Sequence, residues 1–244
     1  MFNSLKVILF DLGSTLIYFD GGYTPWLSEA TSALARSLIG GGFNLDEAAF
    51  ISAYDTRIQA YYQERGSEFI EYTTAYYLRQ ILADFGYPAV PDESIKAALA
   101  SLYSVSQVRY HLEEDTLSTL NELRQRGYHL GLISNAGDNE DVQTLIDQHG
   151  LRSYFEVILV SAEVGIRKPH PRIFQLALDR LGCIAQEAVM VGDTLGADIL
   201  GAHNAGMPGI WITRRADTPD NRDHLDTIRP DLTVDSLAAL LNYL

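Results

Sequence analysis

Short runs of consecutive apolar residues, spaced regularly along the chain, constrain the fold more than any other feature of this sequence. The run Val7–Phe10 contains no alternation with polar residues, which is typical of a strand buried on both faces of a parallel sheet. Further runs occur at 130–133, 157–160, 189–191 and 210–212, and each is preceded by apolar residues at helical spacing. This alternation predicts a doubly wound, mostly parallel, Rossmann-like α/β sheet.

Glycine and proline mark the helices that we expect between these strands. Gly127 and Gly150 stop the first two helices, and Pro171 occupies the first turn of the next. The expected helices, in chain order, are 116–126, 141–149, one that starts at Pro171, 197–204 and one that starts at Ser236.

A long segment near the N-terminus interrupts this pattern. From about residue 25 to residue 105, apolar residues recur at helical spacing and no strand alternation is seen. We therefore expect an inserted α-helical cap domain at 20–111 and an α/β core domain at 1–19 and 112–244. The insert is rich in tyrosine, and tyrosines at helical spacing are expected mainly to pack within or upon the cap.

The acidic balance of the chain limits its partners. Lys and Arg number 18 against 32 Asp and Glu, so the net charge of −14 repels nucleic acid and anionic lipid, and neither is an expected partner. No apolar run reaches the about 18 residues of a membrane span, and the start of the chain lacks the pattern of a secretory signal, so a cytoplasmic location is expected. Cys183 is the only cysteine, which excludes an internal disulfide and a cysteine-based metal cluster. The sequence carries no signal for an oligomeric state.

Polar residues follow four of the predicted strands, at the carboxyl edge where parallel sheets gather ligands. They are Asp11, the pair Ser134 and Asn135, Lys168, and Asp193 with Asp198. Each residue alone could be a turn residue, a helix cap or a solvated charge. Together they bring a hydroxyl, an ammonium and three carboxylates to one edge of the sheet, near solvent, which predicts a functional site. Such a site would supply the local positive charge that a phosphorylated substrate needs on an acidic protein.

The order and spacing of these segments resemble the haloacid dehalogenase superfamily. Its four motifs correspond here to Asp11 with the residues up to Thr15, Ser134, Lys168, and Gly192-Asp193 with Asp198. The helical insert resembles that superfamily's first type of cap domain. The resemblance implies a phosphatase for a small phosphorylated metabolite, in which Asp11 attacks phosphorus and forms an aspartyl phosphate.

The same resemblance implies a Mg²⁺ ion as cofactor and a role for each motif residue. The ligands would be the Asp11 carboxylate, the Gly13 backbone carbonyl and Asp193. Lys168 would keep Asp11 ionised and neutralise the phosphoryl oxygens, while Ser134 and Asn135 would bind those oxygens. Asp198 is expected to orient Lys168 or a metal-bound water without binding the metal directly.

Gly13 departs from the superfamily's pattern, because most of its phosphatases carry an aspartate two residues after the nucleophile. That aspartate protonates the leaving group, and the loss of such a group costs roughly 10²–10⁴ in rate. Three explanations compete: the substrate has a good leaving group, a cap residue or water supplies the proton, or the protein binds phosphate without turnover. Glycine could also be required here for a positive φ.

We expect an active phosphatase that is selective for good leaving groups. The first alternative is a non-catalytic regulatory protein that binds phosphate and Mg²⁺. The second is a 2-haloacid dehalogenase, whose reaction would also start at Asp11 but does not depend on metal.

Overall fold

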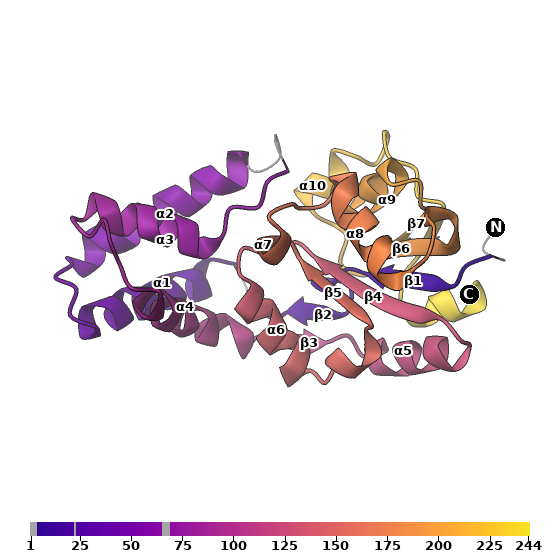
Figure 1. Cartoon of the computed structure of the whole chain (residues 1–244), viewed down its shortest axis with the longest axis horizontal. Helices are drawn as coiled ribbons and strands as arrows, with labels where there is room; N and C mark the ends of the chain where they lie inside the picture. Colours follow the sequence, from indigo (N-terminus) through magenta and orange to yellow (C-terminus); the bar gives the residue numbers. More distant parts are fainter. Residues whose placement is uncertain (1–3, 22, 65–68) are drawn as a thin grey trace.

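The structure, a computed structural model, describes residues 4–21, 23–64 and 69–244 and has a helical part beside an α/β part (Figure 1). The α/β part is built on a parallel sheet of six strands in the order β5-β4-β1-β6-β7-β8. The strands are β1 (Val7–Phe10), β4 (His129–Ser134), β5 (Val157–Val160), β6 (Ala188–Gly192), β7 (Gly209–Ile212) and β8 (Leu232–Val234). This arrangement confirms the predicted doubly wound parallel sheet, to which it adds the unpredicted edge strand β8.

The alternate residues of β1 explain why its sequence shows no polar positions. Ile8 and Phe10 pack on one face of the sheet, against α5 (Thr116–Gln125) and α6 (Asn139–Gln148). Val7 and Leu9 pack on the other face, against α8 (Pro171–Leu181). Because both faces are covered, each residue of this central strand is buried and apolar.

Two of the predicted helices differ from expectation. The helix predicted at 197–204 begins with a π-helical turn, Leu195–Ile199, and continues as α9 (Leu200–Asn204). The helix predicted from Ser236 is only a 3₁₀ turn, Ala238–Asn242. A segment of this length forms i→i+3 bonds more readily than it nucleates an α-helix, because the first α-helical turn fixes several residues for one hydrogen bond.

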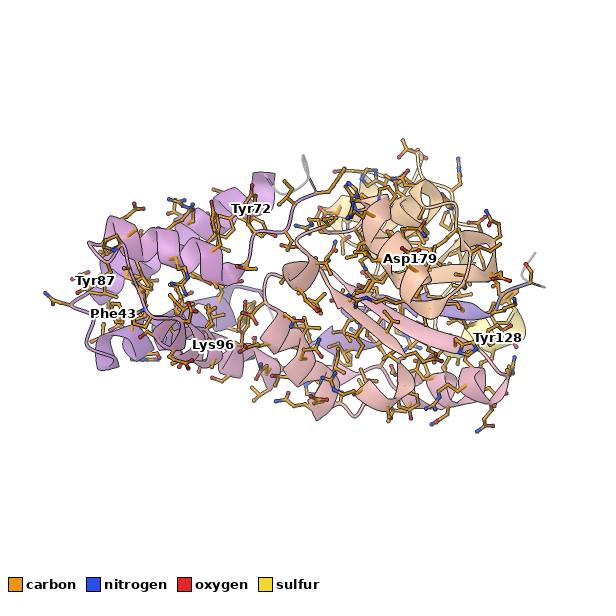
Figure 2. All side chains as sticks on the ribbon, viewed as in Figure 1. Phe43, Tyr72, Tyr87, Lys96, Tyr128 and Asp179 are labelled. Carbon is orange, nitrogen blue, oxygen red and sulfur yellow. The ribbon has the colours of Figure 1, made fainter. Side chains whose placement is uncertain are left out.

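The helical part has its own hydrophobic core, which includes Leu34, Phe50, Leu78 and Leu99. Its helices are α1 (Tyr23–Gly40), α2 (Glu47–Glu64), α3 (Thr74–Asp84) and α4 (Asp92–Gln107). At the end farthest from the sheet, the rings of Phe43 and Tyr87 lie 4.9 Å apart (Figure 2).

A two-stranded antiparallel sheet joins both ends of the helical part. It pairs β2 (Ile17–Phe19) with β3 (Tyr110–Leu112). The predicted domain limits at 20 and 111 lie at or beside these strands, and the division itself stays a prediction. Within the part of the chain that the structure describes, no helix combines the length and hydrophobicity needed to cross a membrane.

Two short helices complete the α/β part. The first is α7 (Ser161–Val164), which follows β5, and the second is α10 (Pro219–Arg222), which lies between β7 and β8. Neither was predicted, because a single helical turn carries no hydrophobic period.

Candidate active site

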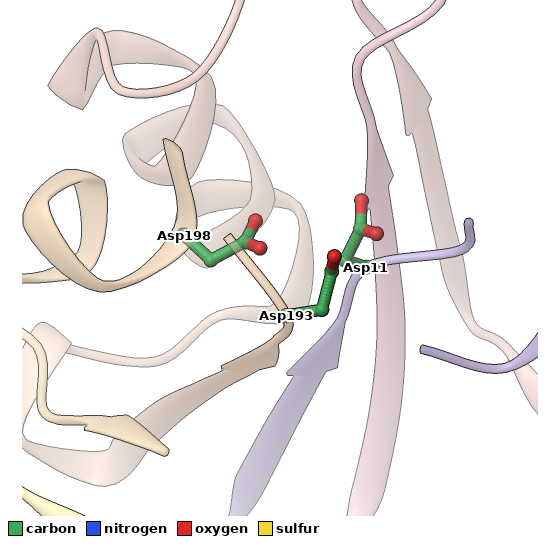
Figure 3. A group of neighbouring side chains, drawn as sticks. All are labelled: Asp11, Asp193 and Asp198. Atoms are coloured by element: carbon green, nitrogen blue, oxygen red, sulfur yellow. The ribbon is translucent and has the colours of Figure 1, made fainter. Parts of the chain in front are cut away.

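The carboxyl ends of β1 and β6 bring two aspartates together. Asp11 follows β1 directly and Asp193 follows β6 directly, and the two strands are parallel neighbours with Phe10 in register with Val191. The carboxylate of Asp198, on the π-helical turn, approaches the same space (Figure 3). One oxygen from each of these three carboxylates lies within 4.8 Å of the others.

The Lys168 ammonium lies among these carboxylates and uses all three of its hydrogens. It donates hydrogen bonds to Asp11 Oδ1 at 2.6 Å, to Asp198 Oδ1 at 2.7 Å and to the carbonyl oxygen of Ile133 at 2.8 Å. The side chains of Lys168 and Asp198 are each 1% exposed and that of Asp11 is 13% exposed. The expectation that the carboxylates beside Lys168 lie near solvent is therefore wrong for Asp198, which is buried on the π-helical turn, whereas Asp11 keeps some exposure where it lines a cavity.

Both oxygens of Asp198 are already engaged by the protein. Its Oδ1 accepts from Lys168, and its Oδ2 accepts from the backbone N–H of Thr194 at 2.9 Å. Asp198 also lies against the backbone of Gly192, where a Cβ would lie only 2.2 Å from its Oδ2. This carboxylate can hold the lysine. All three aspartates line the cavity, but Asp198 is only 1% exposed, against 9% for Asp11 and 7% for Asp193.

Asn135, which follows β4, holds the backbone of Lys168 in place. Asn135 accepts from the backbone N–H of Lys168 at 2.8 Å and donates to its carbonyl oxygen at 2.9 Å, so both ends of the amide are used. The sequence does not reveal this positioning role. Ser134 is 6% exposed and lines the cavity beside Asp11. The expected phosphate contacts of Ser134 and Asn135 stay predictions.

Burial and the neighbouring charges shift the pKa values of Asp11, Asp193 and Lys168. Burial raises the pKa of Asp11 to about 6, although Lys168 opposes the rise. Burial and repulsion from Asp11 and Asp198 raise the pKa of Asp193 to about 8. Burial alone would lower the pKa of Lys168, but the two carboxylates beside it raise that pKa. Three carboxylates thus share one buried ammonium, and a divalent cation would offset the remaining negative charge.

Gly13 is open to substitution. A Cβ at this position meets no atom within 4 Å, and the backbone does not have a positive φ. The left-handed residue in this loop is Ser14, with φ of 57°. The suggestion that glycine is required at position 13 for a positive φ is therefore wrong.

Asn221 belongs to the site although sequence reasoning missed it. This residue is 1% exposed, and its side chain donates to the carbonyl oxygen of Asp193 at 2.9 Å and accepts from the N–H of Leu195 at 2.7 Å. The indole N–H of Trp211 donates to the same Asp193 carbonyl at 2.8 Å. Asn221 is distant in sequence and lies outside the motifs, so only the folded structure reveals that it holds the loop after β6.

Two cavities meet beside the cluster of aspartates and Lys168. One of about 720 Å³ contains Asp11, Lys168 and Asp193, and one of about 260 Å³ lies between the helical part and the α/β part. The second cavity is lined by several of the insert's tyrosines, which are Tyr54, Tyr61, Tyr72, Tyr77 and Tyr103. The residues that line both cavities are Tyr110, Asn135, Ala136, Asp141 and Arg167.

The sequence predicted Asp141 only as the first residue of a helix. An aspartate in a first helical turn is common because it interacts favourably with the helix dipole, so its position alone does not indicate a functional site.

Comparisons with known proteins find relatives along nearly the whole chain. Residues 45–212 match the family model described as haloacid dehalogenase-like hydrolase. A glyceraldehyde 3-phosphate phosphatase from Methanothermobacter thermautotrophicus is 31% identical over 230 residues, which cover 94% of this chain and 95% of the relative.

Solved structures show the same fold over nearly the whole chain. A HAD phosphatase from Thermococcus onnurineus has a TM-score of 0.68 at 24% identity and covers 98% of this chain and 97% of its own. A 2-haloacid dehalogenase from Pseudomonas syringae has a TM-score of 0.67 at 26% identity, with the same coverage of 98% and 97%. The fold is thus shared by proteins named for two different reactions.

Proposed function

Because this chain belongs to the family of haloacid dehalogenase-like hydrolases, we propose that it is a Mg²⁺-dependent phosphatase of a small phosphorylated metabolite. The observation that carries the proposal is the charge of the site. Three buried carboxylates lie together with one ammonium, which bonds to two of them, beside a cavity of about 720 Å³. Such a site favours a reaction assisted by a cation over a metal-independent dehalogenation.

The donor set suits Mg²⁺, which prefers carboxylate and carbonyl oxygens. Asp11, Asp193 and the backbone carbonyl of Gly13 would hold the ion, while Asp198 is already bonded to Lys168 and Thr194. When bound, the ion would neutralise charge on the carboxylates and on the phosphoryl oxygens.

The chain's own residues would then carry the chemistry. Lys168 favours the ionised form of Asp11, whose free carboxylate oxygen attacks phosphorus and forms an aspartyl phosphate. The same ammonium and the Ser134 hydroxyl would stabilise the charge on the transferred phosphoryl group. Asn135 and Asn221 hold the backbone of Lys168 and Asp193 in place.

Substrate class is inferred from the relatives and from the cavities. The relative from Methanothermobacter thermautotrophicus is named for glyceraldehyde 3-phosphate, so a triose phosphate is the first candidate. The second cavity, of about 260 Å³, suits a small leaving group. Gly13 alone led us to expect activity only on substrates with good leaving groups. This restriction would follow only if no other residue protonates the leaving group.

Phosphate release from para-nitrophenyl phosphate and from glyceraldehyde 3-phosphate, with and without Mg²⁺, tests the proposal. We expect metal-dependent release that disappears in Asp11→Asn, because an amide cannot form the acyl phosphate. Asp20→Asn, at an exposed position, is the matched control and should keep its activity. Halide release from a 2-haloacid without metal would favour a dehalogenase, and phosphate binding without turnover would favour the regulatory protein.

A further inference from the structure

The place where the two cavities meet is where the substrate's ester bond would lie. The phosphoryl group must reach Asp11 in the larger cavity, so the rest of the substrate extends toward the smaller one. The leaving oxygen is then surrounded by the residues common to both cavities. Among these shared residues, Asp141 supplies the carboxyl group.

We propose that Asp141 protonates the leaving group and takes the place of the aspartate that is missing at position 13. This inference rests on the proposed phosphatase function. Asp141 lies in the first turn of α6, and its Oδ1 accepts a hydrogen bond from Gln107 Nε2 of α4 at 2.8 Å. Its Oδ2 has no hydrogen-bond partner among the described residues and can carry the proton that is transferred.

The surroundings of Asp141 favour a carboxyl group that can both give and take a proton. Burial raises the pKa of Asp141 to about 7; the hydrogen bond from Gln107 opposes this rise, and repulsion from Asp138 adds a smaller rise. Burial likewise raises the pKa of Tyr103 from α4, and the charges of Asp138 and Asp141 add smaller rises. A carboxyl group with such a pKa keeps a substantial neutral fraction at neutral pH, which a general acid needs.

The other shared residues are less suited to the task. The Arg167 side chain is already engaged, since it faces the Glu71 carboxylate at 3.8 Å and donates to the hydroxyl of Tyr61 at 3.1 Å. Asn135 has an amide without an acidic proton, and that amide already holds Lys168. Tyr110 offers a phenol with a much higher ordinary pKa than a carboxyl group.

The proton balance of the reaction is complete with this assignment. In the first step Asp11 forms a bond to phosphorus, the bond from phosphorus to the leaving oxygen breaks, and that oxygen takes the proton of Asp141. In the second step water attacks phosphorus, Asp141 takes the proton of that water, and the bond from phosphorus to Asp11 breaks. Phosphate leaves, and both carboxyl groups return to their starting states.

The test compares kcat/KM of Asp141→Asn for an alkyl and an aryl phosphate at saturating Mg²⁺. With glyceraldehyde 3-phosphate we expect a fall of roughly 10²–10⁴-fold, because its alkoxide must be protonated as it leaves. With para-nitrophenyl phosphate, whose leaving group is acidic, we expect little change, and this activity also shows that the variant is folded. Glu140→Gln, which removes an exposed charge from the same helical turn, should leave both values unchanged.

The pH profile and a rescue variant separate this role from a structural one. In wild type, kcat/KM for the alkyl phosphate should fall relative to the aryl phosphate as pH rises through about 7, since Asp141 loses its proton there, and Asp141→Asn should lack this fall. Gly13→Asp, at a position open to a side chain, should restore alkyl phosphate activity to Asp141→Asn.

Three results would overturn the assignment and leave the proposed phosphatase function in place. Equal losses on both substrates would show a general role, and no loss would place the proton source elsewhere. A selective loss in Tyr110→Phe instead of Asp141→Asn would assign the proton to the phenol. If wild-type protein hydrolyses neither substrate, the proposed phosphatase function itself fails, and the role of Asp141 fails with it.

Discussion

The Lys168 ammonium has almost no contact with solvent, yet it carries the positive charge of the site. It is 1% exposed and bonds to two carboxylates and one carbonyl. A buried charge is tolerated only when its partners are in place, so the lysine and the carboxylates depend on one another for stability as well as for chemistry.

Lys168→Met should therefore lower stability as well as rate. Removal of the ammonium leaves Asp11 and Asp198 buried without their partner, a change that typically costs about 3–5 kcal/mol. Urea unfolding at neutral pH measures this cost, and Lys6→Met, which removes an exposed ammonium, serves as the control. A variant that is inactive but as stable as wild type would contradict the expected coupling.

Substitution of Asp193 and substitution of Asp198 should have different effects on the affinity for Mg²⁺. Asp193→Asn should weaken Mg²⁺ binding strongly, because its carboxylate faces the cavity, whereas the Asp198 carboxylate is bonded to Lys168 and Thr194. Calorimetric titration with Mg²⁺ alone compares the two variants. If Asp198→Asn weakened binding more than Asp193→Asn, our assignment of the metal ligands would be wrong.

At the scale of secondary structure, the sequence predicted the buried strands and missed the short ones. Long apolar runs identify β1, β4, β5 and β6, and their carboxyl ends locate most of the site. The three-residue strands β2, β3 and β8 are too short to show a period, and their pairing depends on partners elsewhere in the fold. Asn221 and Asp141 were missed for the same reason, since only tertiary packing brings them to the site.

The junction between β6 and the turn that follows it should be very sensitive to side-chain volume. In Gly192→Ala the new Cβ would lie 2.2 Å from Asp198 Oδ2, so Asp198 would have to move away from Lys168. We expect a loss of about 1–3 kcal/mol in unfolding free energy together with a lower rate. Gly40→Ala is the control, because a Cβ there meets nothing within 4 Å. Unchanged stability and activity in Gly192→Ala would show that this turn adapts freely.

At the scale of the whole molecule, a buried polar cluster joins the helical part to the α/β part. The Glu71 carboxylate accepts from Ser161 Oγ at 2.7 Å and from the Tyr61 hydroxyl, and it faces Arg167 at 3.8 Å. Beside it, the N–H of Glu71 donates to the carbonyl of Gly165 at 3.1 Å. These contacts place Arg167 at the border of the two cavities, so the position of the helical part and the shape of the substrate site are linked.

Glu71→Gln should loosen this junction without changing the residues that perform the chemistry. The neutral amide no longer balances Arg167, and its NH₂ group replaces one of the two oxygens that accept from Tyr61 and Ser161, so one of these hydroxyls loses its acceptor and a cost of about 1–3 kcal/mol is expected. Amide hydrogen exchange should become faster at residues 69–71 and 165–167, whose backbones pair in the native structure, and KM should rise more than kcat falls. Glu93→Gln, an exposed charge removal on α4, should change neither measurement. If exchange at 69–71 stayed as slow as in wild type, the backbone pairing alone would hold the two parts together, and the carboxylate of Glu71 would have no part in their docking.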